Sequence, residues 1–206
     1  MENAQKKLDA YIETVRQSGE RKKLLIHACC APCASYVLEY LSACFDLTLL
    51  FYNPNMDTLE EYQKRAEELK RLIREMNLTD KVSLRVLPYD HEAFEKIAEG
   101  LEDAPERGAR CLKCYELRLR KAAEILAAEK EEFESFSTTL TLSPLKNAEA
   151  LNRIGEELSE EYGVPYLPTD FKKKNGYKRS IELSRIYDLY RQNYCGCKYS
   201  KRGKES

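Results

Sequence analysis

Seven of the eight cysteines in this 206-residue chain stand in three short groups. The groups are HACCAPC, CLKC and CGC, which contain Cys29, Cys30 and Cys33, then Cys111 and Cys114, then Cys195 and Cys197. Thiolates are ligands of zinc and of iron–sulfur clusters, and a C-x-x-C pair lets one turn supply two of them. A tetrahedral metal or a cubane cluster takes four thiolates, so seven leave three over (7 − 4 = 3). The grouping predicts a metal site built from three distant parts of the chain, with a role beyond a structural one.

A disulfide framework would also use clustered cysteines. It is typical of short secreted chains, whereas this chain opens with the charged run MENAQKKLDAYIETVRQSGERKK and shows no signal peptide. No apolar run approaches the roughly 20 residues that a spanning helix requires, so we expect no membrane partner. A reducing cytoplasm is the expected compartment, where clustered cysteines bind metals or act in catalysis. The remaining thiol, Cys44, is expected in the core, and the sequence indicates no oligomeric state.

Structural zinc and dithiol redox chemistry also fit clustered thiols. Zinc knuckles usually lie about 15–20 residues apart. Here 77 residues separate Cys33 from Cys111, and 80 separate Cys114 from Cys195. This spacing favours an iron–sulfur site, but residue types alone leave structural zinc and a dithiol enzyme open.

Apolar, β-rich runs alternate with segments of helical period, which predicts an α/β fold with a parallel, doubly wound sheet. Strands are expected at residues 23–27, 47–52, 82–87 and 136–140. Helices are expected near 4–18, over 57–77, from Ser143-Pro144 to Gly163, and near 180–192. In the second helix the spacing predicts a buried face formed by Leu59, Tyr62, Ala66, Leu69, Ile73 and Met76.

The composition, 43% hydrophobic and 33% charged, fits a single α/β domain over residues 1–206 with an N-terminal helix within 1–20. HACCAPC follows the first predicted strand, at the edge where open α/β sheets bind ligands, and Pro32 suits the first turn of a helix. CLKC is expected to precede a long helix, and Gly196 lets CGC turn closely around an inorganic centre. We therefore expect all three groups at one site.

Several blocks together resemble the QueH-type epoxyqueuosine reductases. They are HACCAPC, FYNPNMDTLEEYQKR, ERGARCLKCYELRL, FSTTLTLSPLKN, TDFKKKNGYKRSIELS and YRQNYCGCKYS, in this order over residues 22–200. The resemblance implies a fold related to the PP-loop (HUP-type) tRNA-modifying enzymes, with an additional C-terminal helical segment. It also implies the last step of queuosine biosynthesis, the reductive removal of the epoxide oxygen from epoxyqueuosine in tRNA, without cobalamin.

The resemblance further implies a [4Fe–4S] cluster beside a mononuclear iron. Because some family members have Asp in place of Cys33, this position suits the second iron, which carboxylate and thiolate can both bind. Cys111 and Cys114, with Cys29 or Cys30 and one cysteine of CGC, would hold the cluster. The iron would polarise the epoxide C–O bond while the cluster supplies electrons one at a time. Cys33 is thus a catalytic candidate as well as a ligand.

Deoxygenation also needs protons and an external reductant. The candidate proton donors are Asp170, Tyr115 and His27, although a satisfied strand-end histidine is an equal interpretation of His27. The chain has no G-x-G-x-x-G sequence for a flavin or nicotinamide, so a ferredoxin or flavodoxin is the expected electron donor.

Residues 171–206 carry 11 Lys or Arg against 3 Asp or Glu, a charge of +8 that leaves −9 for the rest. This basic C-terminal segment is expected to complete the metal site and to bind tRNA phosphates through Lys172, Lys173, Lys174, Lys178 and Arg179. Its tyrosines could stack on bases, while a solvated basic face is the alternative. Substrate contacts are also expected from Tyr52, Asn53 and Asn55, for which turn formation is an equal interpretation.

Two further functions fit parts of this pattern. An ATP-dependent tRNA thiolation enzyme would share the fold, but HACCAPC occupies the place of its phosphate loop and contains no glycine. A zinc-stabilised RNA-binding protein would share the thiols and the basic segment, and metal content distinguishes it.

Overall fold

The computed structural model of the chain describes residues 4–201. The ends of the predicted N-terminal helix and basic segment, residues 1–3 and 202–206, lie outside the described residues. The elements are, in chain order, α1 (Ala4–Ser18), β1 (Lys22–His27), α2 (Ala31–Leu41), β2 (Phe45–Phe51), α3 (Leu59–Glu75), β3 (Val82–Val86), α4 (His91–Ala98), α5 (Ala109–Ala128), β4 (Ser135–Thr138), the 3-10 turn η1 (Thr139–Leu142), α6 (Ala148–Tyr162), α7 (Gly176–Ile186) and the 3-10 turn η2 (Lys198–Ser200).

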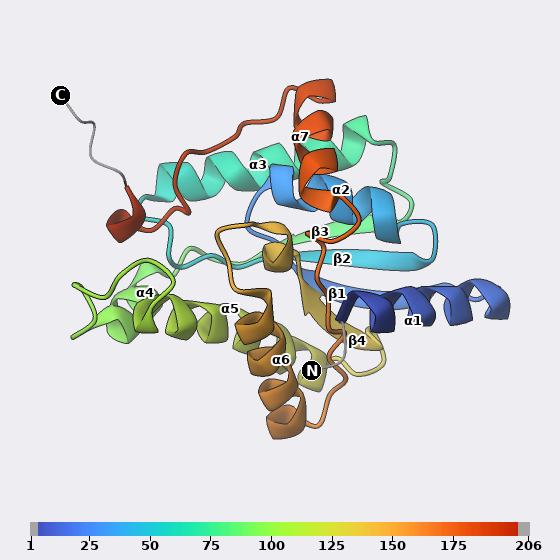
Figure 1. Cartoon of the computed structure of the whole chain (residues 1–206), viewed down its shortest axis with the longest axis horizontal. Coiled ribbons are helices and arrows are strands. Elements are labelled where there is room, and N and C mark those ends of the chain that lie inside the picture. Colours follow the sequence, from blue (N-terminus) through green and yellow to red (C-terminus); the bar gives the residue numbers. More distant parts are fainter. Residues whose placement is uncertain (1–3, 202–206) are drawn as a thin grey trace.

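The four strands form one sheet in the order β3-β2-β1-β4, and every neighbouring pair is parallel (Figure 1). On β1, Leu24 pairs with Leu47 of β2 on one side and with Ser135 of β4 on the other. Parallel neighbours require crossover connections, which the intervening helices provide. The prediction of a parallel, doubly wound α/β fold is confirmed, and all four predicted strands are present.

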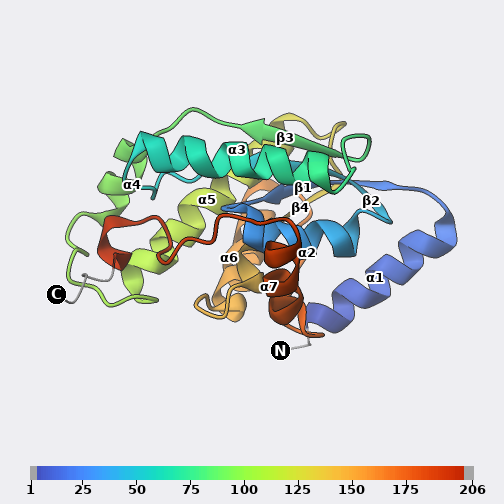
Figure 2. The ribbon, with the colours of Figure 1, turned by 90° about the horizontal axis from the view of Figure 1, so that it is seen from above.

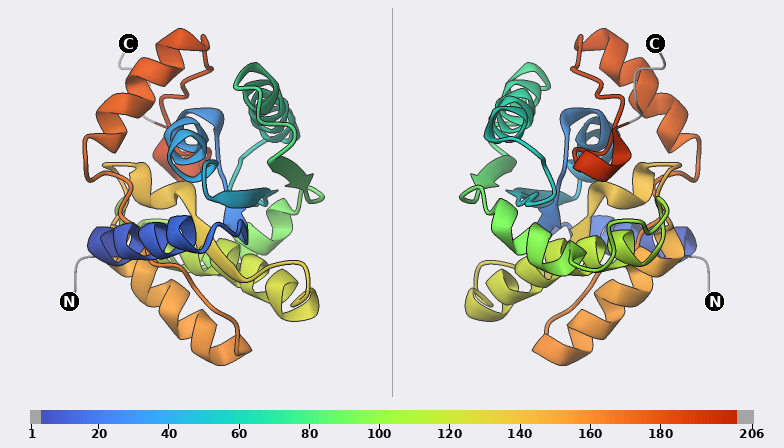
Figure 3. Two further views of the ribbon diagram at one scale, coloured as in Figure 1. Left: turned by 90° about the vertical axis from the view of Figure 1, so that its right-hand side faces the viewer. Right: turned by 90° about the vertical axis from the view of Figure 1, so that its left-hand side faces the viewer.

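Helices cover both faces of the sheet because side chains on each strand alternate in direction. Leu24 and Ile26 of β1 pack with α1, α2, α3 and α7 in one hydrophobic cluster. Leu25, between them, packs with α5 and α6 on the opposite face. Figures 2 and 3 show these layers, with α3 and α7 on the same side as α2. Because all four strands are parallel, their carboxyl ends lie at one edge of the sheet.

The beginning of α6 differs from the prediction. The helix starts at Ala148, because the side chain of Asn147 accepts a hydrogen bond from the Ala150 backbone N–H at 3.1 Å. Ser143 instead closes a turn, in which its carbonyl accepts from the Lys146 N–H at 3.1 Å. The end of α6 at Gly163 was predicted correctly, and Gly163 adopts the left-handed φ of 62° that favours glycine there.

Other boundaries also shift. The fourth strand stops at Thr138 and not at Leu140, because the Thr138 hydroxyl accepts from the Leu140 N–H and starts η1. The expected helix near 180–192 is α7, which ends at Ile186. Leu59 was predicted in the buried face of α3 but is 49% exposed, since it is the first residue after the Thr58 N-cap. Along residues 4–201, the structure has no helix with the length and apolar character needed to traverse a membrane.

Candidate metal centre

Cys29, Cys30 and Cys33 are here called the triad: Cys29 and Cys30 lie in the turn between β1 and α2, and Cys33 lies in the first turn of α2. The N-cap of α2 is Cys30, and Pro32 occupies the first turn, as predicted. The three sulfur atoms lie within 4.8 Å of one another, and the Cys29 and Cys30 Sγ atoms are 3.7 Å apart. Three ligands thus converge within five residues of chain.

The triad holds one negative charge easily and resists a second. The thiols of Cys29 and then Cys33, by hydrogen bonding, hold the pKa of Cys30 well below its usual range. The same hydrogen bond to Cys30 raises the pKa of Cys29 to about 12, and neighbouring thiols also raise the pKa of Cys33. A cation that binds all three sulfurs would remove this repulsion.

The second cysteine group, here called the assembled group, consists of Cys111, Cys114, Cys195 and Cys197. The CLKC pair was expected before a helix but lies inside the first two turns of α5. Cys114 and Cys197 are buried together, and Cys195 packs against them. Burial raises the pKa of Cys114, and the charge of Arg118 opposes this.

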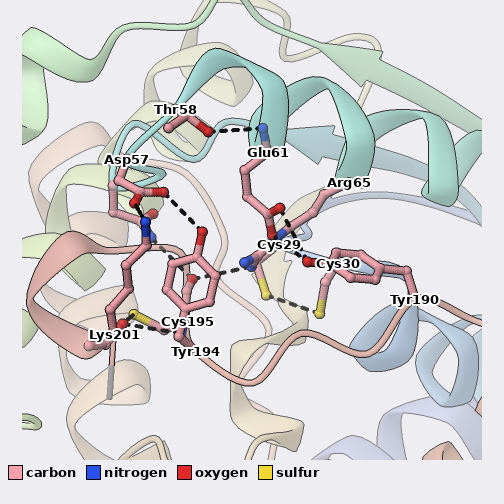
Figure 4. Close-up of polar contacts among 12 residues, drawn as sticks. Cys29, Cys30, Asp57, Thr58, Glu61, Arg65, Tyr190, Tyr194, Cys195 and Lys201 are labelled. Atoms are coloured by element: carbon pink, nitrogen blue, oxygen red, sulfur yellow. Dashed lines mark hydrogen bonds and ion pairs between the residues drawn. The ribbon is translucent and has the colours of Figure 1, made fainter. Parts of the chain in front are cut away.

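Backbone contacts hold the CGC turn in place. The Cys195 carbonyl accepts from Arg65 Nη1 at 3.3 Å and from Asn55 Nδ2 at 3.4 Å (Figure 4). The Gly196 carbonyl accepts from the Asp57 N–H at 2.9 Å. Gly196 has a φ of 106°, a conformation that side chains rarely adopt. The site therefore depends on the loop after β2 and on α3 as well as on the CGC sequence.

Side chains tie the rest of this C-terminal segment to Asp57, in the loop just before α3. The Tyr194 hydroxyl donates to Asp57 at 2.9 Å, and Lys201 forms an ion pair with Asp57 at 2.5 Å. Arg65, which is 1% exposed, is paired with Glu61 at 2.6 Å (Figure 4). Burial alone would lower the pKa of Arg65, but the charges of Cys30 and Glu61 raise it. Arg65 therefore remains cationic beside the triad.

Two adjoining cavities lie among the cysteines. The larger, about 170 Å³, is lined by the triad and Cys195. The smaller, about 20 Å³, is lined by the four cysteines of the assembled group. The residues that line both are Glu106, Arg118, Leu145, Lys146 and Cys195. Cys195 thus connects the two groups, and the convergence of all three cysteine motifs, expected from the sequence, is present in the fold.

The donor set fits a thiolate-bound metal. All eight cysteines are free thiols, and one buried nitrogen beside the triad, Arg65 Nη2, has no hydrogen-bond partner. Soft thiolates select zinc or iron–sulfur centres, and the nearby cation stabilises an anionic centre. Cys44 lies in the hydrophobic core, as predicted.

Several of the remaining predicted site residues support the turn itself. His27 is fully buried, and its ring nitrogens lie 3.1 Å from Thr138 Oγ1 and from the Tyr52 carbonyl. Burial lowers the pKa of His27 to about 3, so the ring is neutral. The Asn53 amide donates to the Ala28 carbonyl at 2.9 Å. These contacts correspond to the structural interpretations of His27 and of the Asn53 loop.

Tyr115 and Asp170, the remaining proton-donor candidates, lie in different surroundings. Tyr115 is 2% exposed and lines the smaller cavity, and burial raises its pKa, so it keeps its proton. Asp170 lines neither cavity and pairs with Lys172 at 3.6 Å. Tyr52, predicted as a substrate contact, is buried with its hydroxyl 3.4 Å from Asp90.

The five predicted tRNA-binding cations divide into two sets. Lys173 and Lys178 are exposed, whereas Lys172 donates to the Lys146 carbonyl at 3.2 Å. Lys174 pairs with Asp9 at 2.6 Å, and Arg179 contacts Glu39 and Glu182. Ion pairs already neutralise part of the predicted basic surface.

The two cations that line both cavities, Arg118 and Lys146, were not predicted as site residues. Arg118 is four residues after Cys114 on α5, which places both on the same face of the helix. Its neighbours on that face, Leu119 and Ala122, are fully buried. Arg118 could have been identified from the sequence, because it is a charged residue on the same helix face as apolar residues and a candidate ligand. Lys146 follows the incorrectly placed N-cap at Ser143, so no local pattern pointed to its position at the cavities.

Comparison with known proteins agrees with this arrangement. The family model described as "Epoxyqueuosine reductase QueH" matches residues 24–203. A protein of that name from Staphylococcus epidermidis is 40% identical over 202 residues, covering 96% of this chain and 84% of the relative. The Streptococcus pyogenes protein is 41% identical, covering 87% of this chain and 71% of its own.

A more distant relative with the same name, from Thermotoga maritima, is 36% identical and covers 86% of this chain and 89% of its own. The matched residues include all three cysteine motifs. The motif order, the shared cavities and these similarities lead to one conclusion: the chain belongs to the QueH family of epoxyqueuosine reductases.

Proposed function

We propose that this chain removes the epoxide oxygen of epoxyqueuosine within tRNA. Both C–O bonds of the epoxide break, two electrons and two protons enter, and the products are an alkene and water. The observation that carries the proposal is the pair of adjoining cysteine-lined cavities. The larger one, about 170 Å³, offers room for a small ring beside the triad.

We assign the cluster to Cys111, Cys114, Cys195 and Cys29. The sequence left open which cysteines of HACCAPC and CGC take part. Cys195 is chosen because it lines both cavities. Cys29 is chosen because its charge interacts with Arg118 and Lys146, as does that of Cys195, in addition to the interaction with Arg65 that it shares with Cys30. Cys33, the half-buried member of the triad, would then hold the second iron.

When bound, such a centre would supply single electrons and a Lewis acid for the epoxide oxygen. The chain itself binds and orients the substrate. The larger cavity has an apolar rim, in which Leu145 is 47% exposed and Tyr177 is 37% exposed. Apolar and aromatic side chains of this kind hold a planar base that leaves its stack. Tyr115 remains the proton-donor candidate that lines a cysteine cavity.

The tRNA backbone would contact the exposed Lys173 and Lys178, close in sequence to Tyr177 on the rim. The electron donor would be a separate ferredoxin-like or flavodoxin-like protein. The eight free thiols support activity in the reducing cytoplasm.

The first test measures the metal. Protein purified without oxygen is expected to contain iron and sulfide, and Cys111→Ala or Cys114→Ala should lose the cluster. Cys44→Ala is the matched control, because Cys44 lies in the core away from both cavities. A zinc-rich, colourless wild-type protein would instead support the function of a zinc-stabilised RNA-binding protein.

The second test separates the two metals through Cys33. Cys33→Ala should keep the cluster spectrum but lose turnover on epoxyqueuosine-containing tRNA with a chemical reductant. Cys33→Asp should retain part of the turnover, because carboxylate also binds iron. Full activity of Cys33→Ala would remove Cys33 from the reaction, and loss of the spectrum would move it to the cluster.

A further inference from the structure

Two cations, one buried and one half-buried, face the cysteines without a carboxylate partner. Arg118 is 2% exposed, and its one side-chain hydrogen bond runs from Nε to the Cys114 carbonyl at 3.0 Å. The Lys146 ammonium lies 5.5 Å from the centre of the Tyr115 ring. Among residues 4–201 neither cation forms a salt bridge. Arg120, half a turn after Arg118 on the same helix, pairs with both Glu116 and Glu161.

An unpaired charge away from water is expensive, so a folded protein retains one only where another charge compensates it. Arg118 and Lys146 both line the larger and the smaller cavity. Glu106 is the carboxylate residue that lines both cavities, and it is exposed at the rim. The groups able to carry a negative charge that interact with both cations are Cys29, Cys195 and Tyr115, and Tyr115 keeps its proton, so the compensating charge must come from the cysteine thiols.

We propose that Arg118 and Lys146 are the counter-charges of the metal–thiolate centre and set its reduction potential. This inference rests on the proposed function, because it requires a redox-active metal at the cysteines. Reduction adds a negative charge to a centre that is already anionic. A nearby cation in a dry site favours the reduced form and raises the potential, and net charge is a principal determinant of the potential in iron–sulfur proteins.

Binding of a substrate phosphate is the competing role for the same two cations. It makes a different prediction, because removing a cation would then weaken tRNA binding and leave the potential of the free protein unchanged. The two roles are separated by measuring the potential without tRNA.

The experiment is an anaerobic redox titration of metal-loaded variants, followed by absorbance. Lys146→Arg should leave the midpoint potential unchanged, Lys146→Met should make it more negative, and Lys146→Glu more negative still. Likewise, Arg118→Lys should leave the midpoint potential unchanged, and Arg118→Met should make it more negative. Arg120→Met is the matched control and should cause no shift, because Arg120 is partly exposed and lines neither cavity.

The proposal is supported if the midpoint potential falls from Lys146→Arg to Lys146→Met to Lys146→Glu, in the order of the charge at position 146. A purely structural role would not make the potential follow that charge. Equal potentials across the Lys146 series overturn it, as does weaker tRNA binding with unchanged potential. If Arg118→Met does not fold, the Lys146 series on the loop before α6 decides the question. If the wild type loads no redox-active iron, the proposed function fails and this inference fails with it, whereas equal potentials in iron-loaded variants overturn this inference alone.

Discussion

The triad and the assembled group reach the same site by different means. Five consecutive residues and one helix start bring the triad sulfurs within 4.8 Å of one another. The assembled group instead joins α5 to a segment some 80 residues later, and the CGC turn is held by contacts from Asn55, Asp57 and Arg65. Local geometry produces one half of the centre, and long-range hydrogen bonds produce the other. The triad should therefore tolerate changes that disrupt the assembled group.

Among the variants that test this comparison of the triad with the assembled group, Arg65→Met is expected to destabilise the protein most. It leaves Glu61, which is 12% exposed, without its ion-pair partner and with the Tyr190 hydroxyl as a donor, and it removes a donor from the Cys195 carbonyl. Breaking a buried pair costs about 3–5 kcal/mol, which thermal unfolding would measure. Lys70→Met on the same helix, 60% exposed, should change stability by less than about 0.5 kcal/mol.

Metal titration of the same variant locates the damage. Arg65→Met should lose the thiolate spectrum that requires Cys195 and retain weaker metal binding at the triad, because Cys30 loses a neighbouring cation while the three thiols stay together. Equal loss at both groups would show that the triad also depends on α3.

Gly196→Ala should have the next largest effect. The new methyl group would need a φ near 106° and would lie 3.0 Å from Met56 Cγ, so we expect a loss of about 2–3 kcal/mol. Gly19→Ala separates strain from contact, because Gly19 has a φ of 70° with nothing within 4 Å. Its cost should be about 1 kcal/mol. If chemical denaturation shows that Gly196→Ala and Gly19→Ala lose the same free energy of unfolding, the close packing around Gly196 adds nothing to the cost of backbone strain.

Asp57→Asn tests the outer attachment of the C-terminal segment. Burial raises the pKa of Asp57, but Lys201 and Tyr194 outweigh it and hold the pKa below 3.8. A carboxylate with a lowered folded-state pKa stabilises the fold above the unfolded-state value, and this stability is lost as the pH falls through the folded-state value. Metal-free wild type should exceed Asp57→Asn by about 1 kcal/mol at neutral pH. That difference should disappear in melting experiments below the folded-state value.

Pro32→Ala probes the triad and should have the smallest effect. Proline in the first turn of α2 stabilises mainly by restricting the unfolded chain, so the loss should be about 0.5 kcal/mol. Metal binding by the triad should persist, because α2 would still begin after Cys30 and keep the three thiols together. Loss of binding would show that the proline itself aligns the sulfurs and that local sequence alone is insufficient.

The same division explains how much could be predicted from the sequence. The strands and α2 follow from short apolar runs and from Pro32, and their positions were correct within a few residues. The start of α6 was misplaced because Ser143 and Asn147 are both good N-caps, and tertiary contacts decide between them. Cysteine motifs identified the candidate ligands because they are local patterns.

The charges around the ligands could not be predicted in this way. Arg65, Arg118 and Lys146 come from three separate elements, and only the folded chain brings them to the cysteines. Asn53 and Asn55, for which substrate contact and turn formation were equal interpretations, both donate to the protein's own carbonyls. Hydrogen bonds of this kind depend on burial, which a linear pattern does not report.

The position of Cys195 near the end of the described chain also has a consequence for biosynthesis. During translation, the triad can form once β1, β2 and α2 have left the ribosome, because these elements pack on one another. Cys195 and its neighbours emerge more than 150 residues later than Cys33. A nascent chain therefore presents three converged thiols long before the ligand that links the two cavities exists. Loading of the full centre would have to wait until Cys195 has been synthesised, and a chain truncated before Cys195 would lack the thiol that lines both cavities.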